Sequence, residues 1–449
     1  MNKHPRIFFL CYPHLGELDS WLSVIDKMNS LAINIKFTLI IPNVMIMRNF
    51  DIDNAIVKIS DSIFDEVLIQ AFDDTLVKHI SLFDSMKWYQ SNHTILRLFD
   101  ILKRLIKRRF FSNILKWPLI LLRNKLYKGK CMMGYEELSG TISQIDILCY
   151  DVAAEINPAI FDVLQLFKKN KKYSISHALS MVGFEGEIQE LDRSIHNKDN
   201  IKVYAHAKFH CKYYNLRYGV DINKIHVVGI PRHDSKWIKR IQEESSELPS
   251  NFDDDNSIVV LSRHVDSHLS YDKKFESLKN IKKIFIDRLG MKVIVKLHPS
   301  EKQEKIYSGK NEVIYEEALG RNNYGLTWVY SDLHAFALCK NKRLAISFYT
   351  GVVFDMVAMG TPCVEYIDLL IKIKNPEKDE KILTPFVKYG FIGGVSNYSD
   401  LCTYVDKWIG NSDQISTASM NTYKKYFQVS NNISEKIATE ILHENNIIG

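Results

Sequence analysis

Two segments of the chain decide its fold: MKVIVKLHPSE at residues 291–301 and RLAISFYTGVVFDMVAMGTPCVEY at residues 343–366. The first segment begins as a short apolar run and stops at His298 and Pro299. Proline has no backbone N–H group, so a central strand does not continue through it. We therefore expect His298 to lie at the carboxyl end of a strand.

The second segment reads as a strand, a tight turn, a helix and another strand. Its apolar run 344–348 leads through Thr350 and Gly351 into the apolar segment 352–359, which ends at a Gly-Thr-Pro sequence. Ligands of open parallel α/β sheets bind at the carboxyl ends of strands, and a helix that begins with small hydroxyl and glycine residues suits a phosphate group. The pattern therefore predicts a phosphate site at this turn.

Polar residues also follow other apolar runs. The run at 6–12 leads into a loop that carries His14 and Glu17 and reaches Asp19, where we expect a helix to begin. Later runs are followed by Asp151, by His177, by His206, by the sequence GIPRHD that contains Arg232, and by Arg263. Because carboxyl ends of parallel strands share one edge of a sheet, this repeated polarity favours a common cleft. Asp19 alone is equally well explained as a helix cap.

The composition is that of an ordinary globular protein of two or three domains, with 449 residues, 46% hydrophobic and 25% charged. The seven cysteines are odd in number and never spaced as CxxC, so neither a disulfide framework nor a zinc site is indicated. The N-terminal apolar run is too short for a secretory signal, and no window reaches the ~18 apolar residues of a membrane span. We expect a cytoplasmic protein, with a peripheral position on the inner face of the membrane left open.

The sequence also predicts how the chain divides. Residues 243–256 (EESSELPSNFDDDN) are acidic and poor in apolar residues, as a domain linker is. Strand and helix patterns alternate on both sides, which predicts an α/β protein with two Rossmann-like domains, 1–242 and 257–425, and a terminal helix in 426–449. A helical insertion is expected at about 82–130. Short additional strands are expected at Asn311 to Tyr315 and at Trp328 to Tyr330.

The net charge of +6 is concentrated in one segment. Residues 101–130 contain ten basic residues and no acidic residue, with Trp, Phe, Leu and Ile between them. This pattern is typical of amphipathic helices that bind an anionic membrane surface. It also fits a helical insertion whose apolar stripe packs on its own domain while the cations stay in water. Nucleic acid is not expected, because no recognition module accompanies the segment.

Three motifs together carry a family resemblance: GIPRHD at 229–234, KLHP at 296–299 and SFYTGVVFDMVAMGTP at 347–362. The chain resembles bacterial surface-polysaccharide transferases of GT-B fold, which have two facing Rossmann-like domains with a cleft between them. Among these it looks like enzymes that use cytidine-nucleotide donors, namely sialyltransferases, Kdo transferases and CDP-glycerol glycerophosphotransferases. The resemblance covers roughly residues 174–366, and only the GELD sequence before them.

Two departures from the family patterns are informative. The glycerophosphotransferases carry His-Gly where this chain has His177-Ala178, and a run of serines where it has Phe348-Tyr349-Thr350-Gly351. Both departures weaken the resemblance to the glycerophosphotransferases of teichoic acid synthesis. No DxD motif follows a strand, and the aspartates at 253–255 lie in the linker, so we expect a metal-independent enzyme without a cofactor.

The resemblance implies roles for the candidate residues. His298 donates a hydrogen bond or a proton to the leaving phosphate, because histidine has an ordinary pKa of ~6.5. The base is Glu17 or Asp19 if the reaction inverts configuration, and Asp151 is the candidate nucleophile if it retains it. Candidate donor-binding residues are Arg263, Lys296, Pro299, Ser347, Thr350 and Gly351, and candidate acceptor or cleft residues are His14, His177 and Arg232.

The expected function is transfer of an acidic sugar, Kdo or a nonulosonic acid such as sialic acid, from its CMP ester to a glycan of capsule or lipopolysaccharide. Two alternatives stay open. One is a transferase of polyol phosphate from CDP-glycerol or CDP-ribitol. The other is a non-catalytic GT-B protein that binds glycan or scaffolds a membrane assembly.

Overall fold

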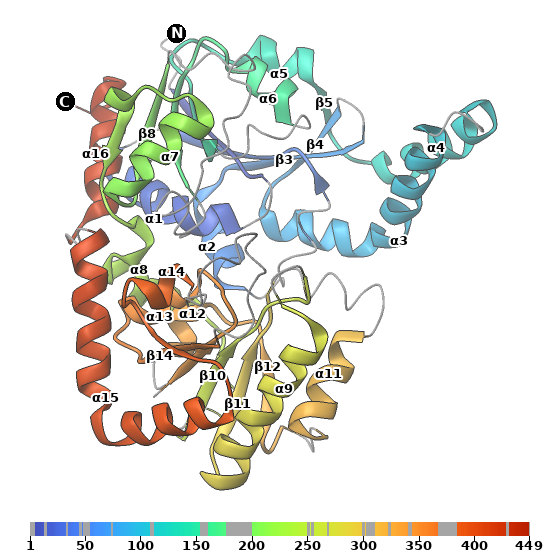
Figure 1. The fold of residues 1–449 in the computed structure, drawn as a ribbon. Coiled ribbons are helices and arrows are strands. Elements are labelled where there is room, and N and C mark those ends of the chain that lie inside the picture. Colours follow the sequence, from blue (N-terminus) through green and yellow to red (C-terminus); the bar gives the residue numbers. More distant parts are fainter. Residues whose placement is uncertain are drawn as a thin grey trace.

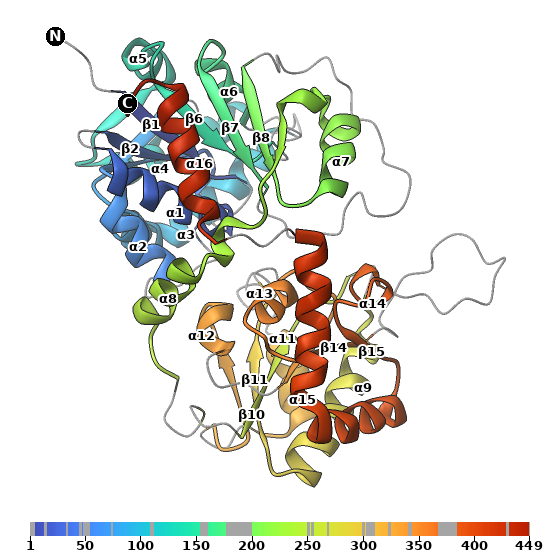
Figure 2. The ribbon, with the colours of Figure 1, turned by 90° about the vertical axis from the view of Figure 1, so that its left-hand side faces the viewer.

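The computed structural model of the protein describes most of the chain and is shown in Figures 1 and 2. The described residues are 5–12, 16–32, 35–44, 47, 54–72, 75–107, 112–152, 160–176, 200–248, 252, 256–266, 269–298, 301, 310–321, 325–339, 344–366, 384–427 and 431–448.

The first half of the chain forms a nine-stranded sheet in the order β5-β4-β3-β2-β1-β6-β7-β8-β9. The strands are β1 (Arg6–Leu10), β2 (Lys36–Ile41), β3 (Glu66–Phe72), β4 (Thr75–His79), β5 (Met132–Gly134), β6 (Ile147–Tyr150), β7 (Lys171–Ile175), β8 (Ile201–Ala205) and β9 (Ile225–Val227). All pairings are parallel except β3 with β4 and β4 with β5. The central strands are buried on both faces, which explains why they read as continuous apolar runs.

Helices cover this sheet and extend from it. They are α1 (Gly16–Leu31), α2 (Ala55–Ile63), α3 (Leu82–Lys107), α4 (Ser112–Tyr127), α5 (Tyr135–Thr141), α6 (Phe161–Leu166), α7 (Lys208–Tyr218) and α8 (Ser235–Glu244), with short 3₁₀ turns η5 (Ile222–Lys224) and η6 (Pro231–His233). In Figure 1, α4 and the end of α3 project away from the sheet as an arm. Helices α3 and α4 lie within the range 82–130 for which the sequence predicts a helical insertion, and Pro118 lies inside α4.

The second half forms an all-parallel sheet of six strands in the order β12-β11-β10-β13-β14-β15. These are β10 (Ser257–Leu261), β11 (Lys292–Lys296), β12 (Trp328–Ser331), β13 (Ala345–Ser347), β14 (Cys363–Tyr366) and β15 (Gly393–Val395). Its helical segments are α9 (Tyr271–Ile281), the π-helical η8 (Lys282–Arg288), α11 (Lys310–Leu319), α12 (Ala335–Cys339), α13 (Val353–Ala358), α14 (Pro385–Lys388) and the long α15 (Tyr398–Phe427).

The last helix, α16 (Ile433–Glu444), returns to the first sheet, where it packs beside α1. Figure 2 shows α15 over the second sheet and α16 over the first. The buried face of α16 includes Ile433, Ile437 and Ile441, at the spacing of one helical stripe. The two ends of the chain are therefore both parts of the first domain.

The predicted α/β fold with two Rossmann-like units is confirmed. One predicted strand is wrong, because Asn311 to Tyr315 lies inside helix α11. The buried residues of this helix are Ile314, Tyr315, Ala318 and Leu319, which lie on one helical face. The strand predicted at Trp328 to Tyr330 is present as β12.

Candidate functional site

The candidate donor site is the edge of the second sheet where β10, β11 and β13 end. We call it the donor edge and define it by the segments that follow these strands: Ser262 to Asp266, His298, and Phe348 to Gly351. Since β10 pairs in parallel with both β11 and β13, these segments leave the sheet on the same side. The sequence prediction that His298 follows a strand is correct, since β11 ends two residues earlier.

His298 is held in its neutral form. Burial lowers the pKa of its imidazole to about 4, and the positive charge of Arg263 and the neighbouring His264 act in the same direction. The rings of His298 and His264 lie 5.6 Å apart between their centroids. At neutral pH His298 is therefore suited to donate a hydrogen bond from its ring N–H. It carries no second proton to transfer unless a nearby anion raises its pKa.

A buried acid that sequence reasoning missed fixes the backbone at His298. The carboxylate of Glu301 accepts hydrogen bonds from the backbone N–H of His298 (2.8 Å), the hydroxyl of Ser262 (3.1 Å) and the hydroxyl of Tyr315 (2.8 Å), and it forms an ion pair with Lys274. The side chains of Lys274 and Glu301 are fully buried. Lys274 also donates to the backbone carbonyl of Arg263 (2.9 Å), so the pair joins the ends of β10 and β11.

We call the Glu301–Lys274 pair the clamp. Its only sign in the sequence is an acid three residues after the histidine, in His-Pro-Ser-Glu. Its basic partner Lys274 lies on α9, in a helix whose other lysines are consistent with a solvated face. Nothing in the local pattern distinguishes Lys274 from them, so the pairing is a property of the tertiary structure.

The turn after β13 has an unusual backbone. Tyr349 adopts a left-handed conformation with φ of 53°, which is rare for a bulky residue. The backbone N–H of Thr350 donates to the hydroxyl oxygen of Ser347 (3.3 Å), which closes the turn. In other proteins, successive backbone N–H groups of turns that contain a left-handed residue form concave anion-binding sites. Thr350 is buried and Gly351 is partly exposed.

Arg263 braces this turn from the end of β10. Its guanidinium donates to the backbone carbonyl of Tyr349 (2.9 Å) and lies 5.4 Å from the centroid of the Tyr349 ring. It also forms an ion pair with Asp266 through two N–H groups, at 3.0 and 2.8 Å. Arg263 was predicted to contact a phosphate. In the structure it joins the ends of β10 and β13, and the carboxylate of Asp266 partly balances its positive charge.

Ser347 is fully buried below the turn, where its hydroxyl also donates to the carboxyl group of Glu365 (3.4 Å) on β14. Burial raises the pKa of Glu365 to about 8, so this acid is neutral at physiological pH. The predicted donor ligand Ser347 therefore supports the turn from inside. Lys296 likewise points to the next loop, with its ammonium group donating to the backbone carbonyl of Leu333 (2.6 Å).

A second group of charged residues joins the two sheets. We call it the interdomain ion network and define it as Asp19 of α1, Arg232 and His233 of η6, His334 before α12, and Asp355 of α13. Arg232 forms ion pairs with Asp19 on one side and with Asp355 on the other, where its contacts are 2.8 and 3.0 Å long.

Two histidines contact the carboxylates of the network: His334 from the second domain and His233 from η6. His334 contacts Asp19 (3.1 Å), and His233 contacts Asp355 (2.7 Å) and the hydroxyl of Tyr423. The elements that follow β1, β9, β12 and β13 therefore meet here.

The network alters the chemistry of Asp19. Burial alone would raise the pKa of this carboxyl, but the charges and hydrogen bonds of His334 and Arg232 outweigh burial and hold the pKa well below its ordinary value. Such a carboxylate is a weak base. The expectation that Glu17 lies in a loop is wrong, because α1 begins at Gly16; acids in a first helical turn are stabilised by the helix dipole.

Asp151 lies at the edge of the first sheet from which α1 also starts. It follows β6, which pairs with β1, and its side chain is fully buried. The indole N–H of Trp21 on α1 donates to the backbone carbonyl of Tyr150 (3.2 Å) and so ties α1 to the end of β6. The negative charge of Asp151 adds to burial in raising the pKa of Tyr150 and of Tyr214 on α7.

Three predicted residues, His14, His177 and Pro299, lie outside the described residues, and so does the side chain of Glu17. Within the described part of the chain, no cluster of three or more His, Cys, Asp or Glu side chains could hold a metal ion. In the same part of the chain, no helix is long and apolar enough to cross a membrane.

No protein-family model matches this sequence, and no curated protein matches it. Solved structures do match. A protein described as a UDP-N-acetylglucosamine 2-epimerase from Listeria monocytogenes is 12% identical, with a TM-score of 0.54 over 100% of this chain and 98% of that chain. The S. aureus MnaA–UDP complex is 11% identical, with a TM-score of 0.55 over 99% and 98%.

The wall teichoic acid polymerase TagF, in a structure with CDPG, is 10% identical, with a TM-score of 0.52 over 98% of this chain and 89% of that chain. At these identities the similarity is one of fold. It covers the whole of this chain, including both sheets and the returning helix α16. The protein therefore has the GT-B fold, with two Rossmann-like domains.

Proposed function

We propose that the protein is a glycosyltransferase that moves an acidic sugar, Kdo or a nonulosonic acid, from a CMP-activated donor to a glycan. The observation that carries this proposal is the donor edge, where neutral His298 and the left-handed turn at Tyr349 follow the parallel strands β11 and β13, which lie on either side of β10. Breaking the bond to a nucleotide phosphate builds negative charge on that phosphate, and preorganised donors stabilise such charge.

In this mechanism His298 donates a hydrogen bond to the leaving phosphate, and the backbone N–H group of Gly351 binds another of its oxygens. Arg263 and Ser347 hold the turn in shape. Asp19 is a weak base because its pKa is lowered. Glu17, in the same first turn of α1, is therefore the base of an inverting reaction in this proposal, and Asp151 is the nucleophile of a retaining one.

The cytidine preference follows from the sequence motifs, and no metal ion or cofactor takes part in the proposed reaction. Titration calorimetry with CMP, CDP and UDP tests the preference directly, and tighter binding of CMP is expected. A His298→Ala variant removes the ring N–H donor, so we expect a loss of transfer of about 10²–10³-fold, as for other single donors to a developing charge. Preference for UDP, or no binding of any nucleotide, would refute the CMP-sugar proposal.

A second candidate is a CDP-linked polyol-phosphate transferase, which the similarity to TagF with CDPG favours. It uses the same donor edge but transfers phosphate together with the polyol. Mass spectrometry of the product separates the two reactions, because only the second adds phosphorus to the acceptor. A UDP preference would instead point to the chemistry named for the MnaA–UDP complex.

We also propose that the arm binds the anionic surface of the membrane on which the acceptor is carried. Among the described side chains of the arm, the exposed apolar ones are Leu98, Ile101, Trp117, Ile120 and Leu121, and the exposed cations of α4 include Arg123 and Lys125. Trp117 is 70% exposed. Tryptophan side chains are most stable where an apolar phase meets water, as at a membrane surface, so this exposure favours a membrane contact.

Flotation with vesicles tests this membrane proposal. A Trp117→Ser/Ile120→Ser variant should lose binding to vesicles that contain anionic lipid by at least about tenfold, since each fully buried apolar side chain contributes roughly 1.5–3 kcal/mol. The matched control is Leu326→Ser, which changes an exposed leucine (62%) in the second domain. Equal binding of all three proteins would contradict the proposal.

A further inference from the structure

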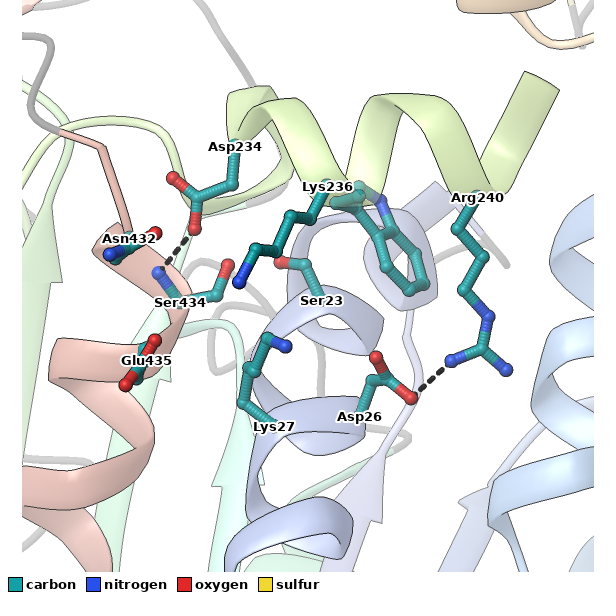
Figure 3. Close-up of a pocket in the computed structure, with 10 residues that line it drawn as sticks. Ser23, Asp26, Lys27, Asp234, Lys236, Arg240, Asn432, Ser434 and Glu435 are labelled. Atoms are coloured by element: carbon teal, nitrogen blue, oxygen red, sulfur yellow. Dashed lines mark hydrogen bonds and ion pairs between the residues drawn. The ribbon is translucent and has the colours of Figure 1, made fainter. Parts of the chain in front are cut away.

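A small polar cavity lies on the first domain, between α1, α8 and the start of α16 (Figure 3). Its volume is about 160 Å³. A water molecule occupies roughly 30 Å³ in the liquid, so the cavity has room for a ligand of only a few heavy atoms. Pockets for nucleotides and other ligands of that size are roughly 300–1,000 Å³, so this cavity is not a second nucleotide site.

Two buried donors line the cavity without a hydrogen-bond partner among the described residues. They are the hydroxyl of Ser23 on α1 and the indole N–H of Trp237 on α8. Ser23 is 1% exposed and Trp237 is 4% exposed. A buried donor that is left unsatisfied costs about 1–3 kcal/mol, so each such group in a folded protein requires an explanation. A ligand with acceptor oxygens supplies one.

Two of the three cationic side chains that line the cavity, Lys27 and Lys236, are also available. Figure 3 shows the ammonium groups of Lys27 and Lys236 directed toward the same space as the hydroxyl of Ser23. Neither lysine forms an ion pair with another residue in the described ranges. Lys27 is partly exposed and Lys236 is exposed, so both ammonium groups can reach an anion that binds over Ser23.

Two of the three acids that line the cavity are already engaged. Asp26 forms an ion pair with Arg240, and Asp234 accepts hydrogen bonds from the backbone N–H groups of Ile433 (3.0 Å) and Ser434 (2.7 Å) at the start of α16. Glu435 is the third acid, and it is partly exposed on α16. Counted together, three acidic and three basic side chains line the cavity, and Lys27 and Lys236 are the two cations without an ion pair in the described ranges.

We propose that this cavity binds a small phosphate-class anion, either inorganic phosphate or the phosphate of a short phosphomonoester. Lys27 and Lys236 supply the charge, and Ser23 and Trp237 supply neutral donors. The site is separate from the donor edge, which is on the other domain. It bridges α1, which carries Asp19, and α8, which follows Arg232 of the interdomain ion network. Occupancy therefore stabilises the helices on which that network is built.

Calorimetry with inorganic phosphate at constant ionic strength tests the proposal. The wild-type protein should bind one phosphate with sub-millimolar to millimolar affinity, and a Lys27→Met/Lys236→Met variant should bind at least tenfold more weakly. Lys239→Met is the matched control, because Lys239 is an exposed lysine of α8 that pairs with Glu243 away from the cavity. Its phosphate affinity should equal that of the wild type.

A second variant separates this site from the donor edge. Arg263→Met perturbs the proposed nucleotide site, and we expect it to keep the phosphate affinity of the wild type while CMP binding weakens. Trp237→Phe, which removes the indole N–H but keeps the apolar ring, should weaken phosphate binding about threefold or more. No binding of phosphate by the wild type, or equal binding by the double lysine variant, would overturn the proposal, and neither result bears on nucleotide binding.

Discussion

His298 combines a position suited to a leaving group with a pKa that keeps it neutral. Burial lowers its pKa to about 4 from 6.5. The unfolded chain therefore binds a proton at higher pH than the folded protein does. The contribution of this residue to stability is present above about pH 6.5 and is lost as the pH falls toward 4. A bound phosphate would favour the imidazolium and raise the pKa again.

The first prediction follows from this shift. At pH 5.5 the binding of CMP to the wild-type protein should take up more protons than binding to His298→Gln, because only the imidazole gains basicity when the phosphate arrives. Calorimetry in two buffers of different ionisation enthalpy measures the proton uptake. The comparison cancels the titration of the nucleotide itself, and equal uptake by the two proteins would mean that His298 does not contact the phosphate.

Glu365 provides a second prediction at this scale. Its pKa is raised from 4.5 to about 8 by burial, so the folded state holds a proton that the unfolded state releases. The stability from this group is complete below about pH 4.5 and declines as the pH rises toward 8, by an amount on the order of 4 kcal/mol. Glu365→Gln mimics the neutral acid and should flatten this decline. Melting temperatures at pH 5, 7 and 8.5 test it, and an unchanged slope would contradict it.

At the level of elements, the sequence predicted where strands end but not what holds the ends together. Apolar runs and a proline identified β11 and His298, because those signals are local. The bond from Arg263 to the carbonyl of Tyr349 and the pairing of Glu301 with Lys274 join residues that are 86 and 27 positions apart. Helix α11 was mistaken for a strand because its short apolar sequence fits either periodicity.

The same limit explains Asp19. Its sequence context fits a helix start or a base, and both interpretations depend on the first domain alone. Its actual partners, Arg232 and His334, come from the end of the first domain and from the second domain. Composition and spacing carry no information about contacts between two domains, so the network could be found only in the folded structure.

The clamp gives a prediction for the loop elements around His298. Glu301→Gln leaves Lys274 buried without a counter-charge, which typically costs about 3–5 kcal/mol. Replacing both partners, as Lys274→Met/Glu301→Leu, should recover most of that loss because no buried charge remains. Urea unfolding measures the free energies. Glu317→Gln on α11 is the control, since Glu317 is exposed and its hydrogen bond from Tyr271 is long (3.4 Å).

A loss in the double variant as large as that in Glu301→Gln would show that the hydrogen bonds of Glu301 to Ser262 and Tyr315, and not the charge pair, stabilise the loops. Activity adds a separate measurement. The double variant removes the acceptor of the His298 backbone N–H, whereas Gln keeps a carbonyl oxygen there, so the double variant should lose transfer activity even where stability is recovered.

For the whole molecule, the interdomain ion network is the feature that relates one sheet to the other. Arg232 lies between Asp19 and Asp355, and both carboxyls have a lowered pKa despite their burial, because the positive charges near them outweigh it. Groups of this kind contribute stability above the ordinary aspartate range, ~3.9, and lose it as the pH falls below that range. The two domains should therefore separate in acid before either of them unfolds.

Arg232→Met tests the network at neutral pH. The variant leaves two buried carboxylates without their shared cation, so we expect a loss of about 3–5 kcal/mol and a larger radius of gyration by small-angle X-ray scattering as the domains part. Arg288→Met is the matched control. It breaks an exposed ion pair with Asp406 (3.2 Å) inside the second domain and should cost no more than about 1 kcal/mol without any change in size. If Arg232→Met is destabilised but keeps the wild-type radius of gyration, the network stabilises the fold without setting the arrangement of the domains.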